Sequence, residues 1–183
     1  MSTGDARLGL ALYDAGLLQF GRFVTDEGPR PFQHHLAMLA SYPALLGALA
    51  ESVAPFLDGV DRLICTENSV ALGVSGSLQS QVPLVIARGN GHDGARDFVG
   101  AYDIGHPAAL IANSLSEIDV ALIARAAVWG LQVRSVVAVL DLGGRPASVP
   151  STALVDLEAL IALLIRERNL PDPLATAMLA WLK

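Results

Sequence analysis

Runs of consecutive aliphatic residues alternate with helix-like segments through the middle of the chain, and this alternation constrains the fold more than any other feature. A strand that is buried on both faces appears in the sequence as an unbroken apolar run, and helices connect such strands in parallel. The pattern therefore predicts an α/β fold with a doubly wound, mainly parallel sheet flanked by helices. The expected strands are residues 61–66, 83–88, 108–112 and 133–142, and the helices between them are 69–79 and 117–129.

The two ends of the chain have different patterns. Apolar spacing predicts a first helix that ends near Gly16, and residues 20–39 contain the Glu-Gly-Pro turn signal of a hairpin. Ser41 is the expected N-cap of the next helix, and two closing helices are expected over residues 156–166 and 174–182. We expect one domain over residues 1–183. Residues 1–40 would form a hood-like helix and hairpin, and residues 41–183 the α/β core with its C-terminal helices.

Composition excludes several classes of protein. The chain has 183 residues and is 52% hydrophobic, yet no apolar run approaches the roughly 18 residues that a membrane-spanning helix needs. The first residues lack the basic start and apolar centre of a signal peptide, so we expect a cytoplasmic protein without membrane contact. The net charge of −6 argues against nucleic acid as a partner, because phosphate backbones require clustered basic residues.

Cysteine and histidine usage argues against a metal site. The only cysteine, Cys65, lies in an apolar run and is expected to be a buried, inert thiol. His34 and His35 are adjacent, so in a strand they point to opposite faces and cannot share a metal. We therefore expect no metal ligands in this chain.

Three segments resemble bacterial orotate phosphoribosyltransferases. Residues 12–32 are similar to the opening helix and hairpin of that family, and residues 87–144 follow its flexible loop, phosphoribosyl diphosphate (PRPP) motif, helix and next strand. Residues 151–164 are similar to its C-terminal helix. The resemblance covers nearly the whole chain and implies the type I phosphoribosyltransferase fold. It also implies a dimer that transfers a phosphoribosyl group from PRPP to orotate with magnesium.

The PRPP motif departs from the family pattern. In the family, two aspartates hold the ribose hydroxyls, and a glycine-containing loop holds the 5′-phosphate through amides and hydroxyls. The aspartate positions are Ala112 and Asn113 here, and residues 114–119 contain no glycine. Glu117 and Asp119 would place two carboxylates beside the phosphate. The resemblance therefore marks a PRPP site whose residues no longer suit PRPP.

The other binding elements of the family are altered too. Glu67, Asn68 and Ser69 occupy the diphosphate loop, where a lysine is expected. The hairpin has Asp26 near the expected lysine and leaves Arg30 displaced. Of the twelve basic residues, eleven are arginine and the only lysine is Lys183, so no lysine-dependent diphosphate site can form inside the fold.

The flexible loop retains basic residues but no lysine. Arg88, His92 and Arg96 could form a small anion site on a glycine-rich lid, or they could belong to an exposed loop without a ligand. If any catalysis persists, these three residues are the candidates for it.

The helix start after the PRPP motif has two interpretations. Ser114 and Glu117 have the spacing of a capping box, which we favour, while together with Asn113 and Ser116 they could instead bind a ligand. Glu67 and Asn68 follow a strand end, where open α/β sheets place ligands. The candidate ligand-binding residues are Arg30, Glu67, Asn68, Ser69, Asn113, Ser114, Ser116 and Glu117.

These features predict an orotate phosphoribosyltransferase-like protein that has lost PRPP-dependent catalysis and acts as a binding, regulatory or structural homologue. We expect no cofactor, a homodimer, and a small anionic or nucleotide-like ligand. The alternative is a divergent active phosphoribosyltransferase, with magnesium and PRPP. In that enzyme arginine and histidine of the lid would replace the lysines, and Asn113 and Glu117 would contact the ribose.

Overall fold

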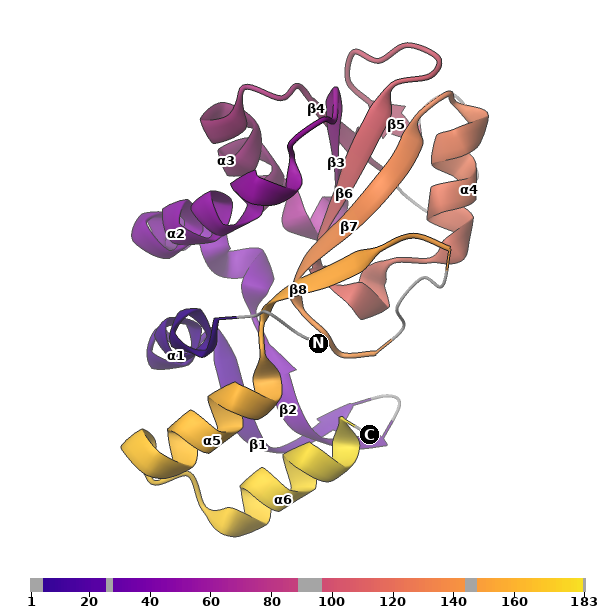
Figure 1. Cartoon of the computed structure of the whole chain (residues 1–183). Helices are drawn as coiled ribbons and strands as arrows, with labels where there is room; N and C mark the ends of the chain where they lie inside the picture. The colour runs from indigo at the N-terminus through magenta and orange to yellow at the C-terminus, as the bar shows by residue number, and fades with distance from the viewer. Residues whose placement is uncertain (1–4, 26–27, 89–96, 144–147, 183) are drawn as a thin grey trace.

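The computed structural model describes residues 5–25, 28–88, 97–143 and 148–182, which form a mixed sheet with helices on both faces and a separate hairpin (Figure 1). The strand order is β5-β4-β3-β6-β7-β8, and all neighbours are parallel except the antiparallel pair β4–β5. The predicted α/β class with a mainly parallel sheet is therefore confirmed. The strands are β3 (Arg62–Thr66), β4 (Leu84–Ala87), β5 (Phe98–Val99), β6 (Pro107–Ser114), β7 (Gln132–Leu140) and β8 (Ser151–Val155).

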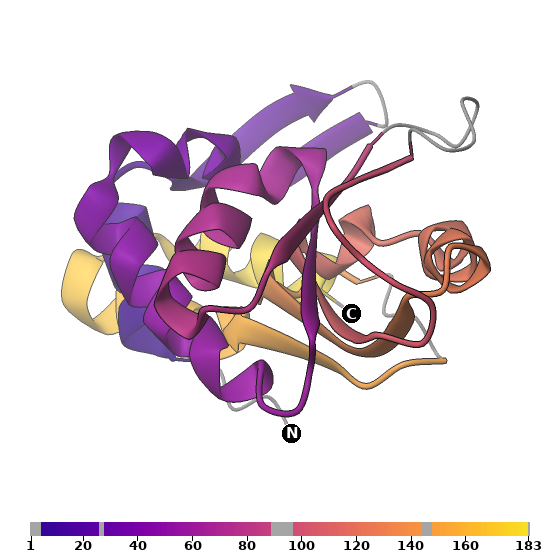
Figure 2. The same ribbon diagram turned by 90° about the horizontal axis from the view of Figure 1, so that it is seen from above.

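Two hydrophobic clusters lie on opposite faces of this sheet. Ala109 and Ile111 of β6 join the cluster that contains α1, α2 and α5 residues, while Ala108 and Leu110 join the cluster that contains Leu122 of α4. This follows from the alternation of side chains along a strand. Figure 2 shows α3 and α4 on opposite sides of the sheet. The helices are α1 (Ala6–Asp14), α2 (Pro43–Val53), α3 (Val70–Ser80), α4 (Val120–Val128), α5 (Leu157–Arg168) and α6 (Asp172–Trp181).

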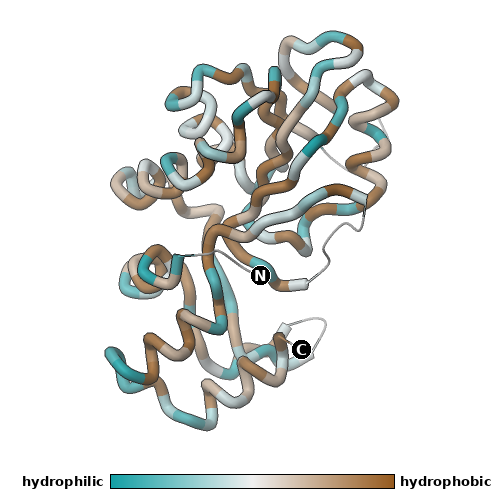
Figure 3. Tube along the Cα trace, viewed as in Figure 1, coloured by the Kyte–Doolittle hydropathy of each residue, from teal (hydrophilic) through white to brown (hydrophobic). Residues whose placement is uncertain are grey.

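The central strands are buried along most of their length, which is why their sequences are continuously apolar. All residues of β6 after Pro107 are buried, and β7 changes from polar at Gln132 and Arg134 to apolar over its last five residues (Figure 3). The carboxyl ends of these strands therefore emerge from a dry core. Polar residues that directly follow the strands are held in place by that core.

Close packing of α3 on β3 positions the turn between them. A Cβ atom at Gly73 would lie 2.7 Å from the Cβ of Cys65, a distance that real side chains do not adopt. Cys65 itself is fully buried, and burial raises the pKa of its thiol to about 12. The thiol is therefore protonated at neutral pH, which fits the inert cysteine expected from the sequence.

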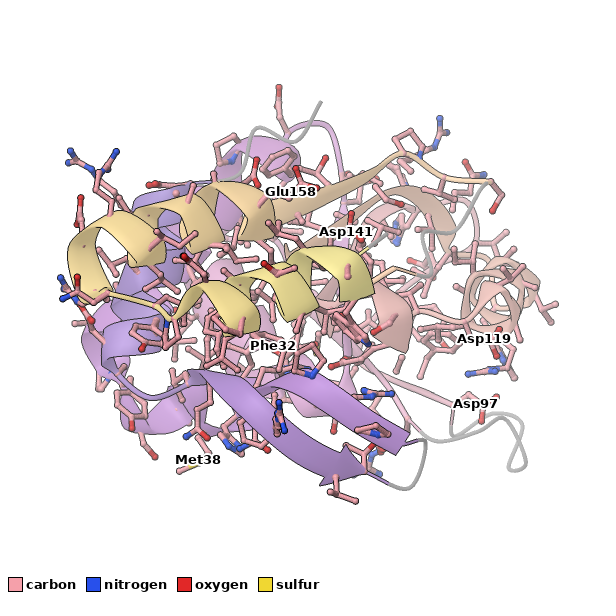
Figure 4. All side chains as sticks on the ribbon, turned by 90° about the horizontal axis from the view of Figure 1, so that it is seen from below. Phe32, Met38, Asp97, Asp119, Asp141 and Glu158 are labelled. Atoms are coloured by element: carbon pink, nitrogen blue, oxygen red, sulfur yellow. The ribbon has the colours of Figure 1, made fainter. Side chains whose placement is uncertain are left out.

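The hairpin is formed by β1 (Leu18–Thr25) and β2 (Gly28–His34), and it packs against α6. The rings of Phe20 and Phe32 lie 5.4 Å apart, and Phe32 lies 6.5 Å from Trp181 of α6, between the hairpin and that helix (Figure 4). The 3₁₀ turn η1 (Leu36–Ser41) leaves the hairpin and contacts the turn η3 (Glu67–Ser69) after β3. The exit of the hairpin thus reaches the carboxyl edge of the sheet.

Several expected boundaries are wrong. The sequence interpretation missed β8, a five-residue strand that immediately precedes α5. The helix expected from Glu117 begins at Val120, because residues 115–117 form the 3₁₀ turn η5. Ser41 does not cap α2: it ends η1, and the N-cap position is Tyr42, with Pro43 in the first turn.

Candidate functional site

The carboxyl ends of β3 and β4 and the turn after β6 surround a cavity of about 270 Å³ beside the start of α4, which we call the β3–α4 cavity. It lies at the edge of the sheet where open α/β proteins place ligands. Its walls come from η3, from the end of β4, from η5 and from the first turns of α4. The lining residues are Thr66, Glu67, Asn68, Ala87, Glu117, Asp119, Leu122 and Arg125.

The turn after β3 is stabilised by its own hydroxyl groups. The backbone N–H of Thr66 donates to Ser69 Oγ at 3.1 Å, and the two hydroxyl oxygens lie 2.8 Å apart. Ser69 Oγ also lies 3.1 Å from the carbonyl oxygen of Ile111 on β6, and its side chain is only 1% exposed. Ser69, a candidate ligand residue, therefore uses its hydroxyl to join β3 to β6.

Asn113 connects the same two strand ends from the other side. Its Nδ2 donates to the carbonyl oxygen of Asn68 at 2.7 Å, across 45 residues of sequence. The side chain is 2% exposed, and its Oδ1 has no hydrogen-bond partner among the residues that the structure describes. A buried amide oxygen without a partner is rare in native proteins, so this atom needs an explanation.

The turn after β6 and the start of α4 are capped by side chains. Ser114 Oγ accepts a hydrogen bond from the backbone N–H of Ser116 at 3.2 Å, and Asp119 Oδ1 accepts from Ala121 at 2.9 Å. The predicted capping box is wrong in its details: Ser114 caps the short turn η5, and Asp119 caps α4. Protein oxygens thus bind amides that a phosphate at this loop would need.

Glu117 lies between the two turns and is half-buried. Burial raises the pKa of its carboxyl group, and hydrogen bonds from the Thr66 hydroxyl, at 3.4 Å, and from the backbone of Asn113 oppose that rise. Desolvation disfavours the charged form of a carboxyl group unless cations or donors surround it. The raised pKa indicates that nearby hydrogen-bond donors and cations only partly offset the cost of burying the charged Glu117 carboxylate.

Among the residues that the structure describes, the charges lining the β3–α4 cavity are mostly negative. Glu67, Glu117 and Asp119 line it together with one guanidinium group, that of Arg125. Arg125 Nε lies 3.8 Å from Oδ2 of the buried Asp97, so part of its charge is directed to a carboxylate. Figure 4 shows Asp97 and Asp119 on the same side of the molecule, beside α4.

A second cavity adjoins the first and lies under the exit of the hairpin; we call it the hairpin cavity. Its volume is also about 270 Å³, and it shares Asn68 and Glu117 with the β3–α4 cavity. Burial, followed by the nearby charges of His35 and Arg30, lowers the pKa of His34, whose Nδ1 is buried without a partner among the described residues. The lining residues are His34, His35, Leu36, Ala37, Met38, Asn68, Asn113 and Glu117.

Arg30 and Arg88 do not line either of these two cavities. Arg30 lines a separate cavity of about 460 Å³, which also includes Arg22 and Trp181. Arg88 is exposed at the end of β4, where its backbone N–H donates to the carbonyl oxygen of Asp97 at 2.7 Å. His92 and Arg96 lie outside the described residues.

Five polar lining residues were not among the candidate ligand residues from the sequence: Thr66, Asp119, Arg125, His34 and His35. Arg125 had a usable signal, because it is a charged residue inside an otherwise apolar helix and follows Leu122 by three positions. The histidines were considered only as metal ligands. Their position at the exit of a hairpin would have placed them near the sheet edge.

Residues 5–25, 28–88, 97–143 and 148–182 contain no group of three or more His, Cys, Asp or Glu side chains that could hold a metal ion. Within the same ranges, every helix is too short or too polar to cross a membrane.

No protein-family model matches the chain, and no curated protein sequence is significantly similar to it. Solved structures do match. UMP synthase of Leishmania donovani superimposes with a TM-score of 0.82 at 24% identity, over 97% of this chain and 42% of that one. Orotate phosphoribosyltransferase of Francisella tularensis gives 0.69 at 17% identity over 96% of both chains, and that of Aeropyrum pernix gives 0.68 at 17% identity over 86% and 97%.

This chain has the orotate phosphoribosyltransferase fold. The fold implied by the sequence resemblance is thereby confirmed. The chain spans less than half the length of the Leishmania UMP synthase. At identities below 25%, the likeness to orotate phosphoribosyltransferases is one of fold, and the chemistry of the site has to be argued from its own side chains.

Proposed function

We propose that this protein is a non-catalytic relative of orotate phosphoribosyltransferases, which binds a small molecule at the carboxyl edge of its sheet and serves a regulatory or structural role. One observation carries the proposal: side-chain oxygens of Ser114 and Asp119 already accept hydrogen bonds from backbone amides at the loop after β6 and at the start of α4. A phosphate that used the amides of Ser116 and Ala121 would have to displace both carboxyl and hydroxyl oxygens.

Charge supports the same conclusion. Transfer of a phosphoribosyl group leaves diphosphate, whose negative charge must be stabilised by cations, amides and a metal ion as the bond breaks. The described residues that line the β3–α4 cavity instead present three carboxylates and one arginine. Like charges close together in a partly buried site repel strongly, so PRPP is expected to bind weakly or not at all.

A second candidate function is a divergent phosphoribosyltransferase, and the position of Arg125 favours it. Its guanidinium group lines the cavity and could contact an anionic substrate. In that case Arg88, with His92 and Arg96, would supply further positive charge, and magnesium would accompany PRPP. The nearby carboxylate of Asp97 reduces the charge that Arg125 can offer, so we favour the non-catalytic function.

The test is turnover by purified protein supplied with orotate, PRPP and magnesium. The proposal predicts that orotidine monophosphate forms no faster than in the absence of protein. Formation that depends on the protein, and is abolished by Arg125→Ala but not by Arg166→Ala on the exposed end of α5, would establish the divergent enzyme instead.

A homodimer and a cytoplasmic location are part of the proposal. Exposed apolar side chains support a subunit contact near α4, where Val128 is 82% exposed and Val120 is 62% exposed. Sedimentation of the purified protein measures the dimer directly. A Val128→Asp variant is expected to shift the protein toward monomer if this face is buried between subunits.

A further inference from the structure

We propose that the cavity between the hairpin and α6 is a second ligand site, which binds a small carboxylate with an apolar body. We call it the α6 cavity. Its volume is about 460 Å³, and it shares no lining residue with the two cavities at the carboxyl edge of the sheet. Figure 4 shows α6 lying along the hairpin, and α6 contacts both of its strands. The site is thus additional to the binding role proposed above and does not depend on it.

A β-bulge places an arginine of β1 at this cavity. Gly21 and Arg22 together oppose the single residue Pro31 of β2, because the pairing register shifts there. Bulges redirect side chains and occur often beside functional sites, and proline suits such an interruption because it has no N–H to donate to the ladder. Arg22 from the bulge and Arg30 from β2 therefore line the same cavity.

Positive charge is concentrated at the α6 cavity, although the chain as a whole has a net charge of −6. Its described lining residues include two guanidinium groups and no carboxylate. The charge of Arg30 is also felt inside the fold, since after burial and the charge of His35 it is the third cause that lowers the pKa of His34. A guanidinium group binds a carboxylate through paired, charge-assisted hydrogen bonds, so an anionic group fits this side of the cavity.

The other side of the cavity is apolar and rigid. Pro29 and Pro31 of the hairpin face Pro173 and Trp181 of α6 across it. Proline rings fix the backbone, and the indole of Trp181 is held 6.5 Å from the ring of the buried Phe32. A preformed wall loses little freedom when a ligand binds, and an indole offers a flat surface to an apolar ring or chain.

The two sides together define the ligand class. The volume of about 460 Å³ lies within the range of about 300–1,000 Å³ that is usual for small-molecule sites. A neutral apolar molecule would bring no partner for the two guanidinium groups, and a small inorganic anion would leave the apolar wall without contacts. A molecule that joins an apolar body to one carboxylate satisfies both sides.

The test compares three probes by calorimetric titration of the full chain. The probe 3-phenylpropanoate has a ring, a short chain and a carboxylate; 3-phenylpropanamide keeps its shape without the charge, and acetate keeps the charge without the body. We expect 3-phenylpropanoate to bind at least tenfold more tightly than either of the others. Its affinity should also fall as the salt concentration rises, because part of the contact is between charges.

Two variants locate the binding. Arg22→Gln removes one guanidinium group, and Ala177→Trp fills the cavity from the exposed side of α6. Each is expected to weaken the binding of 3-phenylpropanoate at least fivefold. The matched controls are Arg134→Gln, an exposed arginine of β7, and Thr176→Trp, at an exposed position of α6 that does not line the cavity. Both controls should leave the affinity unchanged.

Three results would overturn the proposal: binding of the amide as tightly as the carboxylate, no binding of 3-phenylpropanoate at millimolar concentration, or binding that both Arg22→Gln and Ala177→Trp leave intact. Circular dichroism and melting temperature establish that each variant is folded. Arg22→Gln changes an exposed side chain, so it provides the answer if Ala177→Trp does not fold.

Discussion

The loop between β6 and α4 and the neighbouring hairpin cavity differ in how their polar groups are satisfied. In the loop, the side chains of Ser114 and Asp119 accept hydrogen bonds from the amides of Ser116 and Ala121, which a phosphate could otherwise bind. In the cavity, Asn113 Oδ1 and His34 Nδ1 are buried without a partner among the described residues. The loop at the position of the family's PRPP motif is therefore occupied by its own side chains, while the cavity beside it keeps polar atoms without partners in the described part of the chain.

Ser69→Ala is expected to have the largest effect on stability, because it removes the hydroxyl that joins the ends of β3 and β6. The backbone N–H of Thr66 loses its side-chain acceptor and the carbonyl oxygen of Ile111 loses a donor. Unpartnered buried groups cost about 1–3 kcal/mol, and the free energy of unfolding should fall by that amount in urea denaturation. A change as small as that of an exposed serine would contradict the role assigned to Ser69.

Asp119→Ala should convert the capped loop into one with a free amide. Loss of an N-cap reduces the free energy of unfolding by about 1 kcal/mol, and the amide of Ala121 becomes available. Affinity for inorganic phosphate, measured by calorimetry, should therefore rise from undetectable to measurable. The matched control is Asp156→Ala, which removes the equivalent cap of α5 and should lower stability without gaining phosphate affinity.

His34→Phe should stabilise the protein more at acid pH than at neutral pH. Burial lowers the pKa of His34 below its ordinary value of 6.5, so the unfolded chain takes up a proton before the folded one. Above pH 6.5 His34 is neutral in both the folded and the unfolded chain, and the protein has its full stability. As the pH falls toward the folded pKa of His34, this part of the stability is lost. Unfolding free energies at pH 7.5 and pH 5.5 measure this difference.

The same cavity and its surroundings hold other groups that titrate or carry charge, namely His35, Arg30 and Glu117. The charges of His35 and Arg30 act on His34, so the difference between wild type and variant measures His34 together with these interactions. An advantage of the phenylalanine variant that is independent of pH would contradict the assignment.

Glu117→Gln should give the smallest effect. Burial raises the pKa of this carboxyl group, so folding favours its protonated form. Its contribution to stability is present below the ordinary pKa of 4.5 and is lost as the pH rises through the folded pKa. The amide variant should therefore melt at a slightly higher temperature than wild type at pH 7, and the gain should vanish near pH 4. Glu51→Gln on the exposed face of α2 is the control, for which no such gain is expected.

The strands that position the site could be predicted because their burial leaves an unbroken apolar signal, as in β6 and the end of β7. β8 was missed because five residues next to a helix have too short a pattern to separate from it. The 3₁₀ turn at residues 115–117 was missed for a related reason, since two capping patterns overlap within six residues and only the fold decides between Ser114 and Asp119.

The sequence predicted that Asn68, Asn113 and Glu117 lie at or just after strand ends, but it did not predict their hydrogen-bond partners. Asn113 and Asn68 were both recognised as candidates from their places after strands, yet their hydrogen bond spans 45 residues and depends on sheet order. The contribution of His34 depends on the hairpin folding back to the sheet edge, which no local pattern encodes. Hydrogen bonds between residues far apart in the sequence decide which of the predicted polar groups remain free to bind a ligand.

Titration of the full chain with PRPP and magnesium tests most directly whether the phosphate loop is closed by its own side chains. The account predicts no heat of binding and no rise in melting temperature for wild type at millimolar PRPP, since a ligand that binds the folded state must stabilise it. Saturable binding of PRPP by the wild-type protein, with a melting temperature that rises with its concentration, would contradict the account.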